Sequence, residues 1–216
     1  WLAAMLEAVY RAVRGDTGLA HLRIVGGPLR GRPGGGKAHG AADSLDRVYQ
    51  GGIGMFGWGR DGRPFPFDGV GYHLYVHENA TDNMDQQALD LDNTYRAYLS
   101  QMMDVVRRQE GVDKPLYVSE AGWFSNGGNR EFCERFQAGS MQVGINRLLA
   151  EPAVALVFSF CLQDFGGPND GKFYGLYRAG DLGVQNRKPA YDALCALAAS
   201  PSLVPTSERP PIYDSA

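Results

Sequence analysis

Hydrophobic positions along the chain follow two patterns that alternate with each other. Apolar residues three and four positions apart indicate amphipathic helices, and short apolar runs between turn residues indicate buried strands. Together they predict one helix followed by four strand–helix pairs. The predicted helices are Leu2–Arg14, Asp43–Gln50, a long helix that ends at Gly111, Asn129–Ala150, and a last helix that begins at Pro189. The predicted strands are Leu22–Val25, Gly69–Val76, Leu116–Glu120 and Val154–Phe160.

The strict alternation of strands and helices predicts an α/β protein with a parallel sheet covered by helices. Two architectures fit this order, an open doubly wound sheet and a (β/α) barrel. In both, ligands bind beyond the carboxyl ends of the strands. The residues that end the predicted strands are therefore the first candidates for chemistry.

Composition and charge exclude several functional classes. The 216 residues, 44% hydrophobic and 21% charged, suit one globular domain and argue against disorder. A net charge of −3 argues against binding to nucleic acid or to an anionic membrane, since both attract proteins with an excess of positive charge. The longest apolar run, Ala153–Leu162, is too short to cross a bilayer. The three cysteines have no metal-binding spacing, and residues 200–216, with four prolines, are expected to form a tail or linker.

Three short motifs resemble functional sequences but lack their context. Gly31–Ala38, in a Gly/Pro-rich loop expected after the first strand, approaches a phosphate-binding loop. It has alanine where a hydroxyl should hold magnesium, and Pro33 lacks a backbone N–H. Gly52–Gly57 matches a dinucleotide-binding glycine pattern but follows a predicted helix rather than a strand. Asn79–Thr81 is a glycosylation sequon that matters only in a secretory setting.

Polar residues gather on one face of the second predicted strand. Alternation places His73, Tyr75 and His77 together, opposite an apolar face. Residues four apart on a strand lie about 13 Å apart, so His73 and His77 are too far apart to share one metal ion. This face either lines a polar site or contains a hydrogen-bonded core histidine packed beside Tyr75.

A carboxylate ends the third predicted strand. By alternation, Glu120 shares a face with the apolar Leu116 and Val118, directly before a glycine turn. The side chain is either a catalytic group or a charge at the start of a loop. Trp123 follows closely, and its flat ring suits the C–H face of a sugar. The fourth strand end adds Phe160 and the Gln163–Asp164 pair at the same edge.

Five segments together resemble the C-terminal half of a clan-A glycoside hydrolase, of the retaining, (β/α)8-barrel cellulase and β-xylosidase kind. The resemblance covers about residues 2–199 and includes the order of the elements. The segments are Phe67–Tyr75, Pro115–Trp123, Phe158–Asp164, Tyr174–Tyr177 and Lys188–Leu194.

The resemblance implies a TIM-barrel fold of which this chain holds the last four β/α units. It implies that Glu120, at the end of barrel strand seven, is the catalytic nucleophile. The Tyr75 hydroxyl would bind and orient Glu120, and His73 would shape the site. The sugar subsites would be lined by Trp123, Phe160, Gln163, Asp164 and His77. The clan often has tryptophan at the end of strand eight, where this chain has Phe160, Leu162 and Gln163.

Half of the expected active site lies outside this sequence. Retaining hydrolysis uses two carboxylates about 5 Å apart. In the clan, the acid/base glutamate follows an asparagine at the end of strand four, a position expected before the first helix of this chain. We therefore expect a truncated or processed chain whose N-terminal half-barrel comes from the same or another polypeptide. Glu78, Asp82 and Asp164 are weaker substitutes for the acid/base.

The sequence thus predicts hydrolysis of a β-linked oligo- or polysaccharide with retention, without metal or organic cofactor, in a secreted protein. The alternative is a non-catalytic carbohydrate-binding or scaffold protein on a degenerate barrel, which the missing acid/base favours. A third hypothesis, a nucleotide-binding domain, rests on the Gly31–Lys37 loop.

Overall fold

The computed structural model describes residues 1–31, 40–75, 84–126, 128–165 and 173–200, with residues 84–93 as backbone. The helices are α1 (Leu2–Gly15), α2 (Ala41–Phe56), α3 (Met84–Glu110), α4 (Arg130–Ala150), the short 3₁₀ helix η1 (Val184–Asn186) and α5 (Pro189–Ala199). The strands are β1 (Val25–Arg30), β2 (Gly69–Leu74), β3 (Leu116–Ala121) and β4 (Val154–Ser159). The predicted order of one helix and four strand–helix pairs is confirmed.

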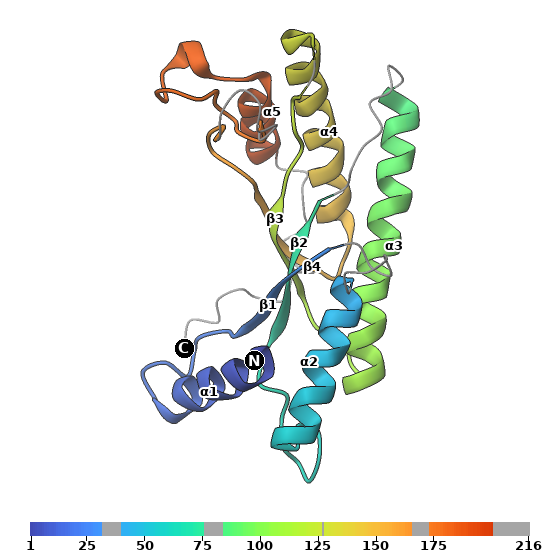
Figure 1. The fold of residues 1–216 in the computed structure, drawn as a ribbon, viewed down its shortest axis with the longest axis vertical. Coiled ribbons are helices and arrows are strands. Elements are labelled where there is room, and N and C mark those ends of the chain that lie inside the picture. The colour runs from blue at the N-terminus through green and yellow to red at the C-terminus, as the bar shows by residue number, and fades with distance from the viewer. Residues whose placement is uncertain (32–39, 76–83, 127, 166–172, 201–216) are drawn as a thin grey trace.

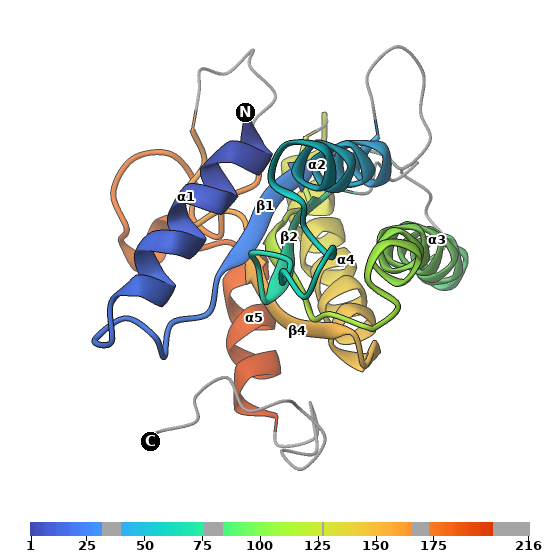
Figure 2. The same cartoon turned by 90° about the horizontal axis from the view of Figure 1, so that it is seen from below.

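The four strands form one parallel sheet in the order β1-β2-β3-β4 (Figure 1). Each helix packs against the next one along the chain, and Figure 2 shows α1 to α5 following one another around the sheet. Right-handed crossovers between sequential neighbours place the connecting helices on the same face of a sheet. The described strands lack the reversal of order that defines a doubly wound sheet, so the barrel-type alternative fits better.

The core lies between the sheet and this helical layer. Alternate residues of β2 and β3 face it and are almost fully buried, and the facing helices contribute long apolar side chains. Its members include Val70, Tyr72, Leu74, Leu116, Val118, Met102, Val106, Ile145 and Leu148. Within the described residues, no helix is long and apolar enough to span a membrane.

The first strand differs from its prediction. It was expected to end at Gly26-Gly27-Pro28, but β1 runs through these residues to Arg30, with an irregular register between Gly26 and Leu29. Gly27 has a φ of +130°, and a Cβ there would lie 2.6 Å from the Gly71 carbonyl oxygen. Glycine therefore lets the strand approach β2 closely and continue, which carries Arg30 to the carboxyl edge of the sheet.

The second helix is longer than predicted and contains the glycine-rich pattern. α2 continues beyond Gln50 to Phe56 and ends at Gly57, which adopts the left-handed conformation with a φ of 72°. Gly52 lies against the buried Trp58 ring, which a Cβ would reach at 1.9 Å. The Gly52–Gly57 pattern thus forms the last turns and the C-cap of α2, where Gly52 allows close packing of Trp58.

The other helix boundaries follow local signals. The Asn129 side chain caps α4 by accepting a hydrogen bond from the Phe132 backbone N–H at 3.0 Å, and Pro189 occupies the first turn of α5. The predicted tail at 200–216 lies outside the described residues apart from Ser200, and so do the sequon at 79–81 and, apart from Gly31, the phosphate-loop candidate.

Candidate active site at the carboxyl edge of the sheet

The direction of the Glu120 side chain depends on an extra residue in β3. Tyr72 pairs with Val118, but the next residue of β2, His73, pairs with Glu120, so Ser119 is an inserted residue. Paired residues of adjacent strands point to the same side of a sheet, and an extra residue reverses the alternation. The prediction that Glu120 shares a face with Leu116 and Val118 is therefore wrong. Glu120 lies on the face of His73, away from the helices.

Three side chains from two strands meet on that face. The Tyr75 hydroxyl donates a hydrogen bond of 2.6 Å to Glu120 Oε2, as the resemblance implied. His73 Nδ1 lies 3.2 Å from the same oxygen. The Glu120 side chain is 30% exposed and that of His73 is 19% exposed. The carboxylate is therefore held by its neighbours and still open to a ligand.

Tyr75 is the most constrained member of this group. Burial, and then its hydrogen bond to the Glu120 carboxylate, raise the pKa of Tyr75 well above its ordinary value. The phenol therefore remains protonated and acts as a donor. The Arg30 guanidinium carbon lies 5.5 Å from the centre of the Tyr75 ring. Arg30 was not predicted as a site residue because the glycines and prolines around it indicated a loop, and its position at the end of β1 became visible only in the structure.

Aromatic rings surround Tyr75 at the ends of β2 and β4. Phe160 is the centre of this aromatic cluster, with ring centroids 6.0 Å from both Tyr75 and Tyr174 and 5.7 Å from Phe165. Tyr174 also contacts Tyr75 at 5.7 Å and Phe124 at 5.8 Å. Phe165 is 43% exposed and offers apolar surface near the site. The predicted lining residue Phe160 is part of this cluster, whereas Phe124 and Tyr174 were not predicted as site residues.

Trp123 does not line the exposed site as predicted. Its side chain is 3% exposed, and its ring packs against Gly144 of α4, where a Cβ would lie 2.2 Å from the ring. Its backbone carbonyl accepts a hydrogen bond of 2.9 Å from the Gln137 side chain. The ring therefore lies in the helical layer, next to Gly144 of α4 and Tyr95 of α3.

Gln163 and Asp164 also differ from their predicted role. The Gln163 amide nitrogen donates to the backbone carbonyls of Arg178 and Gly180, at 3.3 and 2.7 Å. The Asp164 side chain is 5% exposed and forms an ion pair of 2.7 Å with Lys188. Both polar groups hold loops together. Asp164 is therefore also a poor substitute for the acid/base.

The described residues supply one carboxylate to this site. Within them, Glu120 is the carboxylate that contacts Tyr75 and His73, and no second one does. His77, Glu78 and Asp82 lie outside the described residues. The part of the chain that the structure describes contains no cluster of three or more His, Cys, Asp or Glu side chains that could hold a metal ion.

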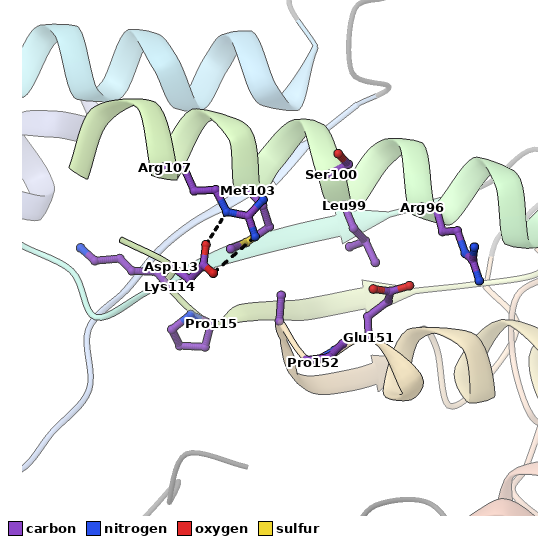
Figure 3. A pocket seen from close by; sticks show the side chains of 11 residues that line it. Arg96, Leu99, Ser100, Met103, Arg107, Asp113, Lys114, Pro115, Glu151 and Pro152 are labelled. Atoms are coloured by element: carbon purple, nitrogen blue, oxygen red, sulfur yellow. Dashed lines mark hydrogen bonds and ion pairs between the residues drawn. The ribbon is translucent and has the colours of Figure 1, made fainter. Parts of the chain in front are cut away.

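Two hollows lie away from Glu120. One, of about 740 Å³, lies between α3 and the connection from α4 to β4 (Figure 3). Its wall includes Arg107 and Asp113, whose side chains are joined at 2.6 Å. The other, of about 450 Å³, is mainly apolar and lies between α4, α5 and β4. Neither hollow is lined by the residues around Glu120.

Comparison with known proteins gives structural likenesses only. No protein-family model matches the chain, and no curated protein sequence matches it. A GH128 (subgroup II) endo-β-1,3-glucanase from Sorangium cellulosum is 23% identical with a TM-score of 0.48, over 83% of this chain and 56% of that one. Xylanase 10B from Thermotoga maritima is 17% identical with a TM-score of 0.43, over 72% and 40%.

A β-D-glucuronidase from Dictyoglomus thermophilum is 15% identical with a TM-score of 0.44, over 76% of this chain and 30% of that one. The chain thus spans about a third to a little over half of the length of these three structures. Because the TM-scores are below 0.5, these likenesses decide neither fold nor activity. The function proposed below rests on the geometry around Glu120.

Proposed function

We propose that this chain carries the nucleophile side of a retaining glycosidase site that acts on a β-linked oligo- or polysaccharide. The observation that supports the proposal is the short hydrogen bond from Tyr75 to Glu120, with His73 beside the same carboxylate oxygen. A carboxylate at the carboxyl ends of parallel strands, oriented by a half-buried phenol and partly open to solvent, suits a nucleophile.

The two carboxylate oxygens of Glu120 differ in their contacts. Tyr75 and His73 both contact Oε2, whereas Oε1 has no such contact within the described residues. In the proposed reaction, Oε1 attacks the anomeric carbon as the glycosidic bond breaks, which forms a covalent glycosyl-enzyme. An acid/base carboxylate outside the described residues protonates the leaving oxygen. It then takes a proton from the water that releases the sugar.

The same proposal requires further strands beside this sheet. Within the described residues, β1 and β4 each have one unpaired edge, and Phe158 of β4 is 56% exposed. Open edges and exposed apolar side chains invite aggregation unless another element covers them. We propose that the remaining β/α units of a closed barrel, from the same or another polypeptide, cover these edges and bring the acid/base within about 5 Å of Glu120.

The test is Glu120→Gln in the intact protein, assayed on a panel of aryl β-glycosides. We expect kcat/KM to fall by at least about 1000-fold, because the amide is a poor nucleophile, with an unchanged melting temperature. Glu131→Gln is the matched control, since its side chain is 81% exposed on α4. Undiminished turnover by Glu120→Gln, or an inverted configuration in the first-formed sugar, would contradict the proposal.

A carbohydrate-binding protein without turnover is the second candidate. It is favoured by the single carboxylate that the described residues bring to Tyr75 and His73. Calorimetry on the intact protein separates the two functions. Saturable sugar binding without any hydrolysis supports the binding function, and retained binding by Glu120→Gln with lost hydrolysis supports the enzyme.

A further inference from the structure

A buried ion pair joins three distant segments beside the candidate site. Lys188, at the start of α5, is 1% exposed, and its ammonium group donates to Asp164 at 2.7 Å. The same group donates to Ser125 Oγ at 3.0 Å and to the Phe173 carbonyl at 3.4 Å. The pair therefore connects the segment after β3, the segment after β4 and the start of α5.

The backbone on both sides of Tyr174 is bonded to this pair. Asp164 Oδ1 accepts a hydrogen bond of 2.7 Å from the Gly175 N–H. The Ser125 N–H donates to the Phe173 carbonyl at 3.0 Å. The ion pair is thus hydrogen-bonded to the residues on both sides of Tyr174, while the Tyr174 carbonyl itself accepts a hydrogen bond of 3.1 Å from the Gln137 side chain.

Tyr174 in turn packs on the residue that orients Glu120. Its ring contacts Tyr75 with centroids 5.7 Å apart. Gly122, two residues after Glu120, makes this close packing possible: a Cβ there would lie 3.0 Å from both rings and 2.8 Å from the Phe160 carbonyl. A continuous series of contacts therefore leads from Lys188 through Tyr174 and Tyr75 to Glu120.

Stability alone does not account for such a pair. Burial lowers the pKa of Lys188, because the charged form loses its hydration, and the Asp164 carboxylate opposes this effect. A well-packed apolar pair in place of a buried ion pair is often as stable or more stable. The hydrogen bonds that Lys188 donates and Asp164 accepts have defined directions, which apolar contacts lack, and they give each of the three segments a defined position.

We propose that the Lys188–Asp164 ion pair is a positioning device that holds Tyr174 against Tyr75 and so keeps the Tyr75 hydroxyl on Glu120. The effect of the ion pair on turnover rests on the function proposed above, whereas its effect on the positions of the Tyr174 and Tyr75 rings does not.

The chain contains a matched control at the other edge of the sheet. Lys114 forms an ion pair of 2.6 Å with Glu110, and both side chains are largely buried. Burial also lowers the pKa of Lys114. Glu110 accepts a hydrogen bond from Tyr49, so this pair has a tyrosine reporter of its own. Neither member contacts Tyr75 or Tyr174 in the described structure.

The experiment uses the intact protein labelled with 3-fluorotyrosine and observed by ¹⁹F NMR. The resonances of Tyr49, Tyr75 and Tyr174 are assigned from the respective Tyr→Phe variants. We expect Lys188→Met to shift or broaden the Tyr75 and Tyr174 lines and leave Tyr49 unchanged, and Lys114→Met to do the reverse. Unchanged Tyr75 and Tyr174 lines in folded Lys188→Met would overturn the proposal. Equal changes at these lines in both variants would also overturn it.

A second variant and an activity measurement complete the test. If Lys188→Met does not fold, the double variant Lys188→Met/Asp164→Asn removes both charges and is examined in the same way. For turnover, we expect Lys188→Met to lower kcat by about 10- to 100-fold with little change in KM, because a misplacement of about 1 Å suffices for such a loss. Lys114→Met should leave both constants unchanged.

The NMR and activity results separate the two proposals. Ring shifts together with an unchanged kcat would show that the pair does not position the reacting groups. Undiminished turnover by Glu120→Gln would remove the proposed function, and the NMR result would still decide whether the pair positions the rings.

Discussion

A buried lysine–carboxylate ion pair lies at each end of the strands, at the amino edge and at the carboxyl edge of the sheet, and the two pairs serve different purposes. At the amino edge, Glu110 pairs with Lys114 and accepts from Tyr49, and the Lys114 ammonium lies 4.4 Å from the centre of the Phe67 ring. The Glu110 side chain is 6% exposed. At the carboxyl edge, Glu120 is 30% exposed.

The difference lies in which groups are left open to a ligand. The amino edge satisfies its buried polar groups internally, which is what a stable fold requires. The carboxyl edge uses the Lys188–Asp164 pair and the aromatic cluster to hold Glu120 in place, and leaves part of the carboxylate exposed. In TIM-barrel enzymes, the active site lies at the carboxyl ends of the strands, and the amino ends serve stability.

The largest expected effect concerns the amino edge. Glu110→Ala removes the partner of a buried lysine and of Tyr49, so the free energy of unfolding should fall by about 3–5 kcal/mol. Urea unfolding measures this loss, and turnover of the folded fraction should be unchanged. A loss of turnover per folded molecule would show that the two edges are not independent.

The second substitution, Tyr75→Phe at the carboxyl edge, should reduce turnover rather than stability. Removing one donor to the proposed nucleophile Glu120 should lower kcat by about 100- to 1000-fold, while the free energy of unfolding changes by at most about 1 kcal/mol. Tyr49→Phe is the matched control and should show a similar small loss of stability with normal kcat. Equal kcat values for the two variants would contradict the division between the edges.

A smaller effect tests the position of Trp123. Gly144→Ala places a methyl group where Trp123 and the Tyr95 hydroxyl now lie, 2.2 and 2.8 Å away, so it should destabilise the protein by about 1–3 kcal/mol. Gly54→Ala in α2 is the control: its added methyl meets nothing within 4 Å, and helix propensity should raise stability by up to about 1 kcal/mol. Thermal unfolding distinguishes them. Neutral behaviour of Gly144→Ala would place the Trp123 ring outside the core.

The smallest expected effect is the pH-dependent contribution of Asp46, in α2, to the stability of the amino edge. A hydrogen bond of 2.8 Å from Arg108, next to Gln109 and Glu110 in α3, lowers the pKa of Asp46. Because the folded value lies below the unfolded one, the stabilisation is present above the unfolded pKa and is lost as pH falls through the folded pKa. Asp46→Asn should lose less than about 1 kcal/mol at neutral pH. Melting temperatures from pH 7 to 3 should then decline less steeply than in the parent, and an equal decline would exclude Asp46 as a contributor.

Local sequence patterns determined the elements and part of the site. The order of helices and strands was predictable because side-chain period is a local property of the backbone. The shared face of His73 and Tyr75 was predictable for the same reason, and both contact Glu120. The hydrogen bond from Tyr75 to Glu120 was implied only by the family resemblance, since the two residues are 45 positions apart.

The tertiary structure decided everything that depends on register and on distant partners. The extra residue Ser119 reversed the face of Glu120, and a bulge is visible only in the pairing of two strands. Asp164 looked like a ligand-binding acid until Lys188, 24 residues away, was found beside it. The sequence by itself determined the order of the elements and placed His73, Tyr75 and Glu120 at the carboxyl ends of their strands. Only the tertiary structure decided which polar groups are buried in pairs and which face a ligand, because the partner of a buried polar group is chosen by packing and not by local pattern.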